Sequence, residues 1–308
     1  MTRSDLDALF ESLSNWGRWG SDDERGMLNH LLPEHAREAA ADVREGLAIS
    51  LAHDLDLHPT PETPVPAQHH MLAAGDARKE SGIAGYEAAR DFVGAHVHGL
   101  GVTHIDALCH MFVRGRMYND VPASEVRSDG ARRNTLLALE NGIVGRGVLI
   151  DLAAGRGVDF IDGSEAISLA ELEATATQQG VTVGAGDILM IATGRDARRR
   201  SADGALDPAD GMVGLHPECL PWLREREIAV LGSDGISDPL PGLGIESWPF
   251  PIHQIGITAM GLHLIDNLAL GALSAACAER ERWTCLFSLG ALRVPGATGC
   301  PVNPIALL

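Results

Sequence analysis

The chain has 308 residues, 45% of them hydrophobic and 21% charged, which is typical of a folded globular protein. Its formal net charge of −18 disfavours binding to nucleic acids and to anionic membrane surfaces, since both carry negative charge themselves. No apolar stretch of about 18 residues occurs, the N-terminal segment has no apolar leader, and the five cysteines include no CxxC pair, so we expect a reduced, cytoplasmic protein.

Short aliphatic segments bounded by glycine or charged residues predict β-strands in six places. These are residues 46–55, 91–100, 146–153, 186–194, 227–234 and 283–294. Residues 58–82 lie between the first two segments and are rich in proline, glycine and charge. That composition predicts a long loop, either a lid over a binding site or a mobile surface excursion.

Helical segments alternate with the later strands. Ser168 and Glu171 have the spacing of a capping box, and Gly180 suits the end of the helix that they begin. Residues 216–227, with a proline near their start, and the small-residue stretch 269–280 predict two more helices. Mixed strands and helices without an internal repeat favour a single α/β domain over residues 1–308.

The segment "HVHGLGVTHIDALCH", residues 96–110, holds four of the 13 histidines. In a strand, residues two apart share a face at a Cα separation of about 6.6 Å, so His104 and Asp106 can converge on one ion. Imidazole together with carboxylate suits Zn²⁺ or Mn²⁺, whereas Ca²⁺ prefers an all-oxygen shell. One helical turn after Asp106 would return His110 to the same place, as a ligand or as a general base.

His98 is harder to place, because it precedes His104 by six residues. That spacing is about 20 Å along a regular strand, too far for two ligands of one ion. Gly99 and Gly101 would permit a bulge or a sharp bend that folds His98 back. With the bend, His98 is a candidate ligand, and without it His98 is only a neighbour; His96 is interpreted as structural.

From residue 103 onward this segment resembles the signature H-x-G-T-H-x-D-x-P-x-H of the cyclase-like metal hydrolases, the family of bacterial arylformamidase (kynurenine formamidase) and isatin hydrolase. Thr103, His104, Asp106 and His110 match it position by position. The resemblance implies that His104 and Asp106 bind the metal and that His110 serves as the base or proton shuttle.

The segment also departs from the signature. In an ungapped alignment the first ligand position falls on Leu100, the glycine on Val102 and the proline on Leu108. Either His98 takes the place of the first ligand or this chain has lost one.

The resemblance extends over roughly residues 16–300. Residues 19–29 are similar to the opening of the larger family members, and residues 251–273 to the segment that completes the metal site. This implies His253 and Asp266 as further ligands, although the family more often has Glu at the second position. It also implies a swivelling β/β/α fold with a mixed sheet or barrel-like core and flanking helices, an N-terminal extension of about residues 1–45, and a homodimer or higher homo-oligomer.

Three residues are candidates for contacting a substrate. Trp19 either lines an aromatic pocket or packs in the core, Asp234 ends a predicted strand where it either caps a turn or touches substrate, and His216 either faces a pocket or caps a helix. Cys109 lies beside His110, but neighbours in a strand point to opposite faces, which disfavours a Cys–His nucleophile. The absence of G-x-S-x-G and of a complete G-x-G-x-x-G after a strand disfavours a serine hydrolase and a nucleotide-binding protein.

The motifs and the resemblance together predict a hydrolase with one or two Zn²⁺ or Mn²⁺ ions. The expected substrate is a small cyclic amide, imide or lactone, or an N-formyl aromatic amine. Two alternatives stay open. One is a metal-dependent cyclase or dehydratase of a biosynthetic pathway, which removes water instead of adding it. The other is a non-catalytic ligand-binding descendant, which the residue Leu100 makes credible.

Overall fold

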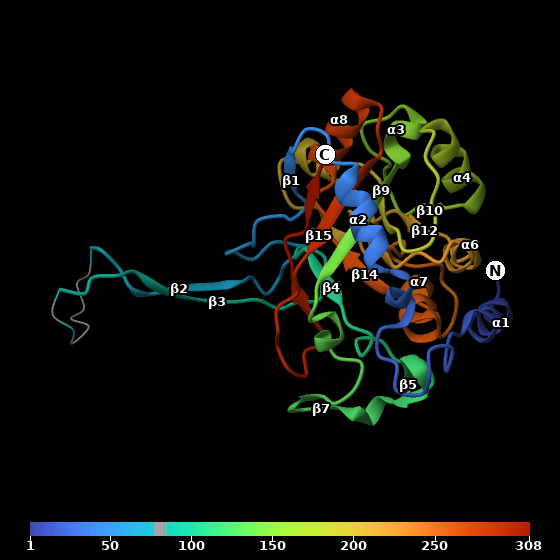
Figure 1. Cartoon of the computed structure of the whole chain (residues 1–308), viewed down its shortest axis with the longest axis horizontal. Helices are drawn as coiled ribbons and strands as arrows, with labels where there is room; N and C mark the ends of the chain where they lie inside the picture. Colours follow the sequence, from blue (N-terminus) through green and yellow to red (C-terminus); the bar gives the residue numbers. More distant parts are fainter. Residues whose placement is uncertain (77–82, 84) are drawn as a thin grey trace.

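The computed structural model describes residues 1–76, 83 and 85–308, and within them a nine-stranded mixed sheet forms the centre of the molecule (Figure 1). The strand order is β1-β17-β15-β9-β11-β13-β14-β4-β16. These strands are β1 Ala48–Ser50, β4 His104–Asp106, β9 Ile143–Asp151, β11 Ile188–Ala192, β13 Val230–Ser233, β14 His263–Asp266, β15 Thr284–Leu289, β16 Gly299–Pro301 and β17 Ile305–Leu307. Separate two-stranded pairings are formed by β2 Gln68–Ala73, β3 Arg90–Gly94, β5 Arg116–Met117, β6 Val121–Pro122, β7 Val126–Arg127, β8 Gly130–Ala131, β10 Ala166–Ile167 and β12 Gly214–Leu215.

Helices surround the sheet (Figure 1). The α-helices are α1 Arg3–Leu13, α2 Pro33–Ala41, α3 Leu152–Arg156, α4 Leu169–Gln178, α5 Arg195–Ser201, α6 Cys219–Glu225, α7 Pro251–Ile255 and α8 Gly271–Arg280. Short 3₁₀ turns occur at Gly26–His30, Tyr118–Asp120, Ala123–Glu125, Leu136–Leu139 and Pro208–Asp210, and one π-helical turn at Gly256–Met260. None of the helices in the described ranges combines the length and the apolar character that a bilayer span requires.

The middle of the sheet is parallel and its flanks are antiparallel. Strands β9, β11, β13 and β14 run in the same direction, while β4 is antiparallel to β14 and β15 is antiparallel to β9. Parallel neighbours need crossover connections, and α3 to α7 lie in the segments that link these strands along the chain. The expected mixed sheet with flanking helices is confirmed.

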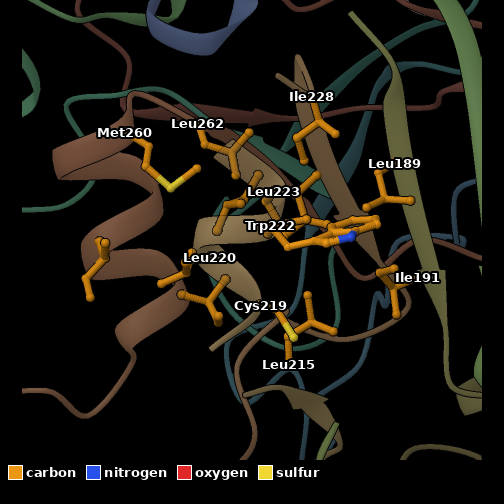
Figure 2. Close-up of a cluster of buried hydrophobic side chains, with 14 of the residues drawn as sticks. Leu189, Ile191, Leu215, Cys219, Leu220, Trp222, Leu223, Ile228, Met260 and Leu262 are labelled. Atoms are coloured by element: carbon orange, nitrogen blue, oxygen red, sulfur yellow. The ribbon is translucent and has the colours of Figure 1, made fainter. Parts of the chain in front are cut away.

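The sheet separates two hydrophobic cores, because side chains alternate along each strand. Leu189 and Ile191 of β11 point toward α6, on which Trp222 lies, and belong to one core (Figure 2). Met190 of the same strand belongs to the other core, together with Leu273 of α8. A fully buried side chain of this size contributes roughly 1.5–3 kcal/mol relative to an exposed one, so both faces of the sheet stabilise the fold.

Strands β2 and β3 form an antiparallel hairpin that projects away from the rest of the molecule (Figure 1). Part of the segment 58–82, expected to be a long loop, is therefore strand β2, and residues 77–82 of that segment lie outside the described residues. Along the hairpin, Met71, Leu72, Phe92 and Val93 are between 47% and 58% exposed. We call this hairpin, residues 68–73 and 90–94, the arm.

Strand β3 ends earlier than the sequence predicts. The expected strand 91–100 stops at Gly94, and the chain then runs through an irregular segment into β4 at His104. This irregular segment contains His98, and its path determines where that side chain lies.

Candidate metal centre

The neighbouring strands β4 and β14 bring one histidine and two aspartates together. His104 of β4 is paired directly with Asp266 of β14, and Asp106 lies two residues along β4 on the same face. The Nε2 atom of His104 is 3.5 Å from Oδ1 of Asp106 and 4.0 Å from Oδ2 of Asp266. Its Nδ1 lies 2.8 Å from the carbonyl oxygen of Val102, which can only accept, so Nδ1 donates there and Nε2 faces the carboxylates.

Helix α7 supplies a second imidazole. The Nε2 atom of His253 is 3.2 Å from Asp266 Oδ2 and 3.6 Å from Asp106 Oδ2. On the other side of the ring, Nδ1 is 2.7 Å from Oδ2 of Asp238, whose carboxylate also accepts the backbone N–H groups of Ile252 and His253. Burial alone would lower the pKa of His253, but Asp266 and Asp238 outweigh it and hold the pKa well above its usual range.

The irregular segment before β4 turns His98 back toward the same place. Its Nδ1 atom is 3.0 Å from Asp106 Oδ1, and its Nε2 is 3.0 Å from Oγ1 of Thr298. Gly99 has a φ of +144°, a conformation that side chains strongly disfavour. The structure thus contains the bend that the two glycines permit, and it brings His98 to the carboxylate.

His110 follows β4 in a tight turn and not in the helical turn considered from the sequence. Its backbone N–H donates to the carbonyl of Ala107 at 2.9 Å, and its ring stacks in parallel on His98 with centroids 3.7 Å apart. Burial lowers the pKa of His110 to about 4, although the nearby Asp106 opposes that shift. The imidazole is therefore neutral near pH 7 and can accept a proton.

These side chains have the chemistry of a metal site. Within the described residues, candidate ligand atoms come within 4.8 Å of one another in two groups that share Asp106. The groups are His98, Asp106 and His110, and His104, Asp106 and Asp266. Oδ2 of Asp106 and Oδ1 of Asp266 are buried and accept no hydrogen bond from the described part of the chain, and Oδ1 of Asp106 has only the 3.0 Å contact with His98. Buried carboxylate oxygens without donors are costly unless a cation satisfies them, so the residues fit a divalent ion.

The charge of Asp106 supports the same interpretation. Burial would raise its pKa, but His98 and the other surrounding imidazoles hold it well below the usual range. An ionised carboxylate at the centre of three or four imidazoles suits Zn²⁺ or Mn²⁺ better than Ca²⁺. The two groups that share Asp106 would hold one ion or two.

The candidates for substrate contact lie elsewhere. The indole of Trp19 packs edge-on against His30, with ring centroids 5.3 Å apart, and beneath the guanidinium of Arg18. His216 is 3.3 Å from a carboxylate oxygen of Glu218 and accepts that residue's backbone N–H. The contacts described for both residues are local ones, as core packing and helix capping would give.

Asp234 lies at the end of β13, where its carboxylate is fully used. It accepts the backbone N–H groups of Thr193 and Arg195 and the hydroxyl of Thr193. It also lines a cavity of about 460 Å³ between α3, α5 and α8, together with Asp151 and Asp196. We use the name imidazole–carboxylate cluster for His98, His104, Asp106, His110, His253 and Asp266. None of these residues lines this cavity in the described structure.

Three residues that support the cluster were not predicted from the sequence. Asp238 orients His253 from 15 residues earlier, and Thr298 contacts His98 from 200 residues later. Asn267 follows Asp266 and donates to two carbonyls of the irregular segment. Asp238 shares the short acidic sequence "GSDGISD" with Asp234, which is the one signal that could have drawn attention to it.

Cys109 takes no part in the cluster. It is buried, and burial raises the pKa of its thiol to about 12, so the thiolate needed for a nucleophile is scarce at neutral pH. Cys109 and His110 lie in a turn after β4 and not in a strand, so the opposite-face argument made from the sequence does not apply to them.

Comparisons with known proteins agree with the fold and the motif. Residues 47–238 match the model of a family described as putative cyclase, and no curated protein sequence matched the chain. A crystal structure described as that of a novel cyclase superposes with a TM-score of 0.85 at 29% identity, covering 96% of this chain and 100% of the other.

Two isatin hydrolase structures are more distant. One, bound to the product analogue thioisatinate, has a TM-score of 0.59 at 19% identity, covering 89% of this chain and 95% of the other. Isatin hydrolase A from Labrenzia aggregata, bound to benzyl benzoate, has a TM-score of 0.56 at 21% identity, covering 91% and 98%. At such identities the likeness concerns the fold.

Proposed function

Because the chain belongs to the putative cyclase family, we propose that it is a metal-dependent hydrolase whose ligands are His98, His104, Asp106, His253 and Asp266. The observation that carries the proposal is the convergence of three imidazoles on two buried carboxylates, each of which has an oxygen that accepts no hydrogen bond from the described residues. Zn²⁺ and Mn²⁺ are the ions that this set of nitrogen and oxygen donors favours.

A divalent ion in this cluster would polarise a carbonyl group and lower the pKa of water. A side chain of the protein would accept and transfer the proton. His110 is the residue for that role, since its ring lies against the proposed ligand His98, and burial, which lowers its pKa, keeps the imidazole neutral. Asp238 would hold His253 in one orientation through the Nδ1 contact. Cys109 would not serve as a nucleophile, because burial raises the pKa of its thiol.

The proposed substrate is a small cyclic amide, imide or lactone, or an N-formyl aromatic amine. The isatin hydrolases that share the fold are named for opening a cyclic amide, which makes that class the first to test. Trp19, Asp234 and His216 remain candidates for contacting the substrate, although their described contacts are with their own neighbours.

The test of the proposal is the metal content of the purified protein, measured by elemental analysis for three forms. Wild type is expected to hold Zn²⁺ or Mn²⁺ in stoichiometric amount, and His104→Ala to lose most of it because a ligand is gone. His216→Ala removes a histidine outside the cluster and should keep the metal. Equal metal content in wild type and His104→Ala would overturn the proposed site.

Turnover then separates the hydrolase from its alternatives. With a panel of cyclic amides, imides, lactones and formanilides, wild type is expected to add water, and His110→Ala to retain metal while losing activity. Products that have lost water would identify a cyclase or dehydratase that uses the same site. A protein that holds no stoichiometric metal and turns over no panel member would favour the ligand-binding descendant.

We further propose a cytoplasmic homo-oligomer. The five free, buried cysteines fit a reducing compartment. The arm supports the oligomer, because a two-stranded hairpin is marginally stable alone in water and this one presents Met71, Leu72, Phe92 and Val93 at its surface. A second copy of the chain would cover these side chains.

A further inference from the structure

The irregular segment that carries His98 is held by donors from other parts of the chain. Asn267 Nδ2 donates to the carbonyl oxygens of Gly99 and Val102, at 2.8 and 3.1 Å. The carbonyl of Leu100 accepts from Arg195 Nη2 at 3.2 Å. Three of the four carbonyls between His98 and Thr103 therefore accept from the buried side chains of Asn267 and Arg195, and the Leu100 carbonyl also accepts from Arg199 at 3.4 Å.

These hydrogen bonds matter because the chain must reverse its direction between His98 and His104. His98 precedes His104 by six positions, a span of about 20 Å if extended. The two rings are nevertheless 5.4 Å apart, centroid to centroid. Gly99 permits the reversal but does not select it, since glycine has more backbone freedom than any other residue. Hydrogen bonds to the carbonyls select one path, and they satisfy acceptors that the protein interior would otherwise leave unpaired.

The holding residues are anchored in turn. Asn267 is fully buried, its Oδ1 accepts from Arg195 Nη1 at 2.9 Å, and its own carbonyl accepts from the hydroxyl of Thr103 at 2.6 Å. Arg195 pairs with the buried carboxylate of Glu62, which also pairs with Arg199. The amide of Asn267 is thus oriented with its donors toward the segment.

Val102 links this arrangement to the second imidazole. Its carbonyl accepts both from Asn267 and from His104 Nδ1, the bond that keeps Nε2 of His104 facing the carboxylates. Asn267 therefore influences the placement of His98 in the irregular segment and of His104 in β4.

We propose that Asn267, oriented by Arg195, is a positioning residue that holds the Gly99–Val102 segment in the bend that places His98 as a metal ligand. This inference rests on the proposed metal site. It explains how a histidine two positions away from the family's first ligand position, Leu100, takes that ligand's place: the carbonyl of Leu100 is bound by arginine, and the reversal at Gly99 directs His98 inward.

The test measures the affinity for Zn²⁺ and for Mn²⁺, by competition with a chromophoric chelator, in wild type, Asn267→Asp, His98→Ala and the double variant. Aspartate keeps the shape and the acceptor for Arg195 but removes both donors to Gly99 and Val102. Asn267→Asp is expected to bind metal roughly 10- to 100-fold more weakly, the usual effect of losing a group that orients a ligand. In the double variant the effects should not add, because the Asn267 variant already removes the contribution of His98.

Asn119 offers a matched control. Its φ is +61° against +55° for Asn267, its amide donates to two backbone carbonyls, those of Gly20 and Asp23, and its Oδ1 accepts one hydrogen bond. Asn119→Asp should therefore cost similar stability and leave metal affinity unchanged. Asn267→Gly, which suits the positive φ without strain, provides a second variant that removes the amide if the aspartate does not fold.

Several outcomes would contradict the inference. Additive losses in the double variant, or an equal loss in Asn119→Asp, would overturn it while leaving the metal site intact. A wild-type chain that binds neither Zn²⁺ nor Mn²⁺ would overturn the metal site and the positioning role together. The two failures are thus distinguishable.

Discussion

The imidazole of His253 is contacted through both of its nitrogen atoms. Asp238 binds Nδ1, while Nε2 faces Asp266 and Asp106. A carboxylate on the far side of a ligating histidine fixes the ring and makes the other nitrogen more basic. Asp238→Asn removes that charge, and we expect Zn²⁺ affinity to fall roughly 10- to 100-fold, measured by chelator competition.

Asp234 provides the comparison for this variant. Like Asp238, it is a buried carboxylate that accepts two backbone N–H groups and one side-chain donor. Asp234→Asn should therefore destabilise the fold to a similar degree and leave metal affinity unchanged. Equal losses of affinity in the two variants would show that Asp238 acts only through stability.

The sequence predicted the relative placement of those site residues that are close together along the chain. The two-residue spacing of His104 and Asp106 placed them on one face of a strand, and the structure has them there. The position of His98 could not be predicted, because its bend depends on Asn267 and Arg195, far along the chain. The roles of these residues as ligands stay predictions until metal binding is measured.

Glu62 joins the segment that precedes the arm to helix α5. Its carboxylate is buried, pairs with Arg195 and Arg199, and accepts the backbone N–H of Leu206. Burial would raise its pKa, but the two arginines outweigh burial and hold the pKa below its usual value of 4.5. The folded protein thus binds the proton on Glu62 more weakly than the unfolded chain does.

This difference predicts how the free energy of unfolding changes with pH. A lowered pKa in the folded state adds stability above the unfolded pKa, and that stability is lost as the pH falls through the folded value. Glu62→Gln should therefore be clearly less stable than wild type at pH 7, and the gap should narrow below about pH 4.5. Urea unfolding between pH 7 and pH 3.5 measures this gap.

An exposed pair serves as the control for that measurement. Glu45 also pairs with an arginine, Arg280, but lies at the surface, where solvent screens the interaction. Glu45→Gln should change stability little at any pH. A gap between wild type and Glu62→Gln that is constant with pH would contradict the role assigned to the buried carboxylate.

The elements were predicted best where local pattern and burial agree. The segments 186–194 and 227–234 contain β11 and β13, since continuous aliphatic runs suit strands that are buried on both faces. The segment 146–153 overlaps β9, and 283–294 contains β15. Strand β2 was missed within 58–82, since its partner β3 lies beyond the intervening segment and its sequence "QHHMLA" has no clear alternation. Pairing of distant strands is not encoded in either strand alone.

The arm gives a prediction for the whole molecule. If a second copy covers it, the double variant Leu72→Ser with Val93→Ser should shift the protein toward the monomer mass of 32.6 kDa, because both side chains are more than half exposed in the single chain. Light scattering after size exclusion measures the mass. Metal content should stay the same, since the arm is separate from the imidazole cluster.

The body of the molecule offers a matched pair of apolar residues for comparison. Val158 and Leu292 are 46% and 56% exposed, and their double change to serine should leave the oligomeric state as it is. A monomeric wild-type chain, or equal behaviour of both double variants, would contradict assembly through the arm.

The burial of every cysteine has a practical consequence for studying that assembly. Burial raises the pKa of Cys109, Cys219, Cys277 and Cys285 to about 12, and Cys300 is also buried with a raised pKa. Thiol reagents react with exposed thiolates, so the native protein presents little background to them at neutral pH. One cysteine introduced on the arm would therefore carry a spin label or a fluorophore alone, and the distance between two labels would report how the copies are arranged.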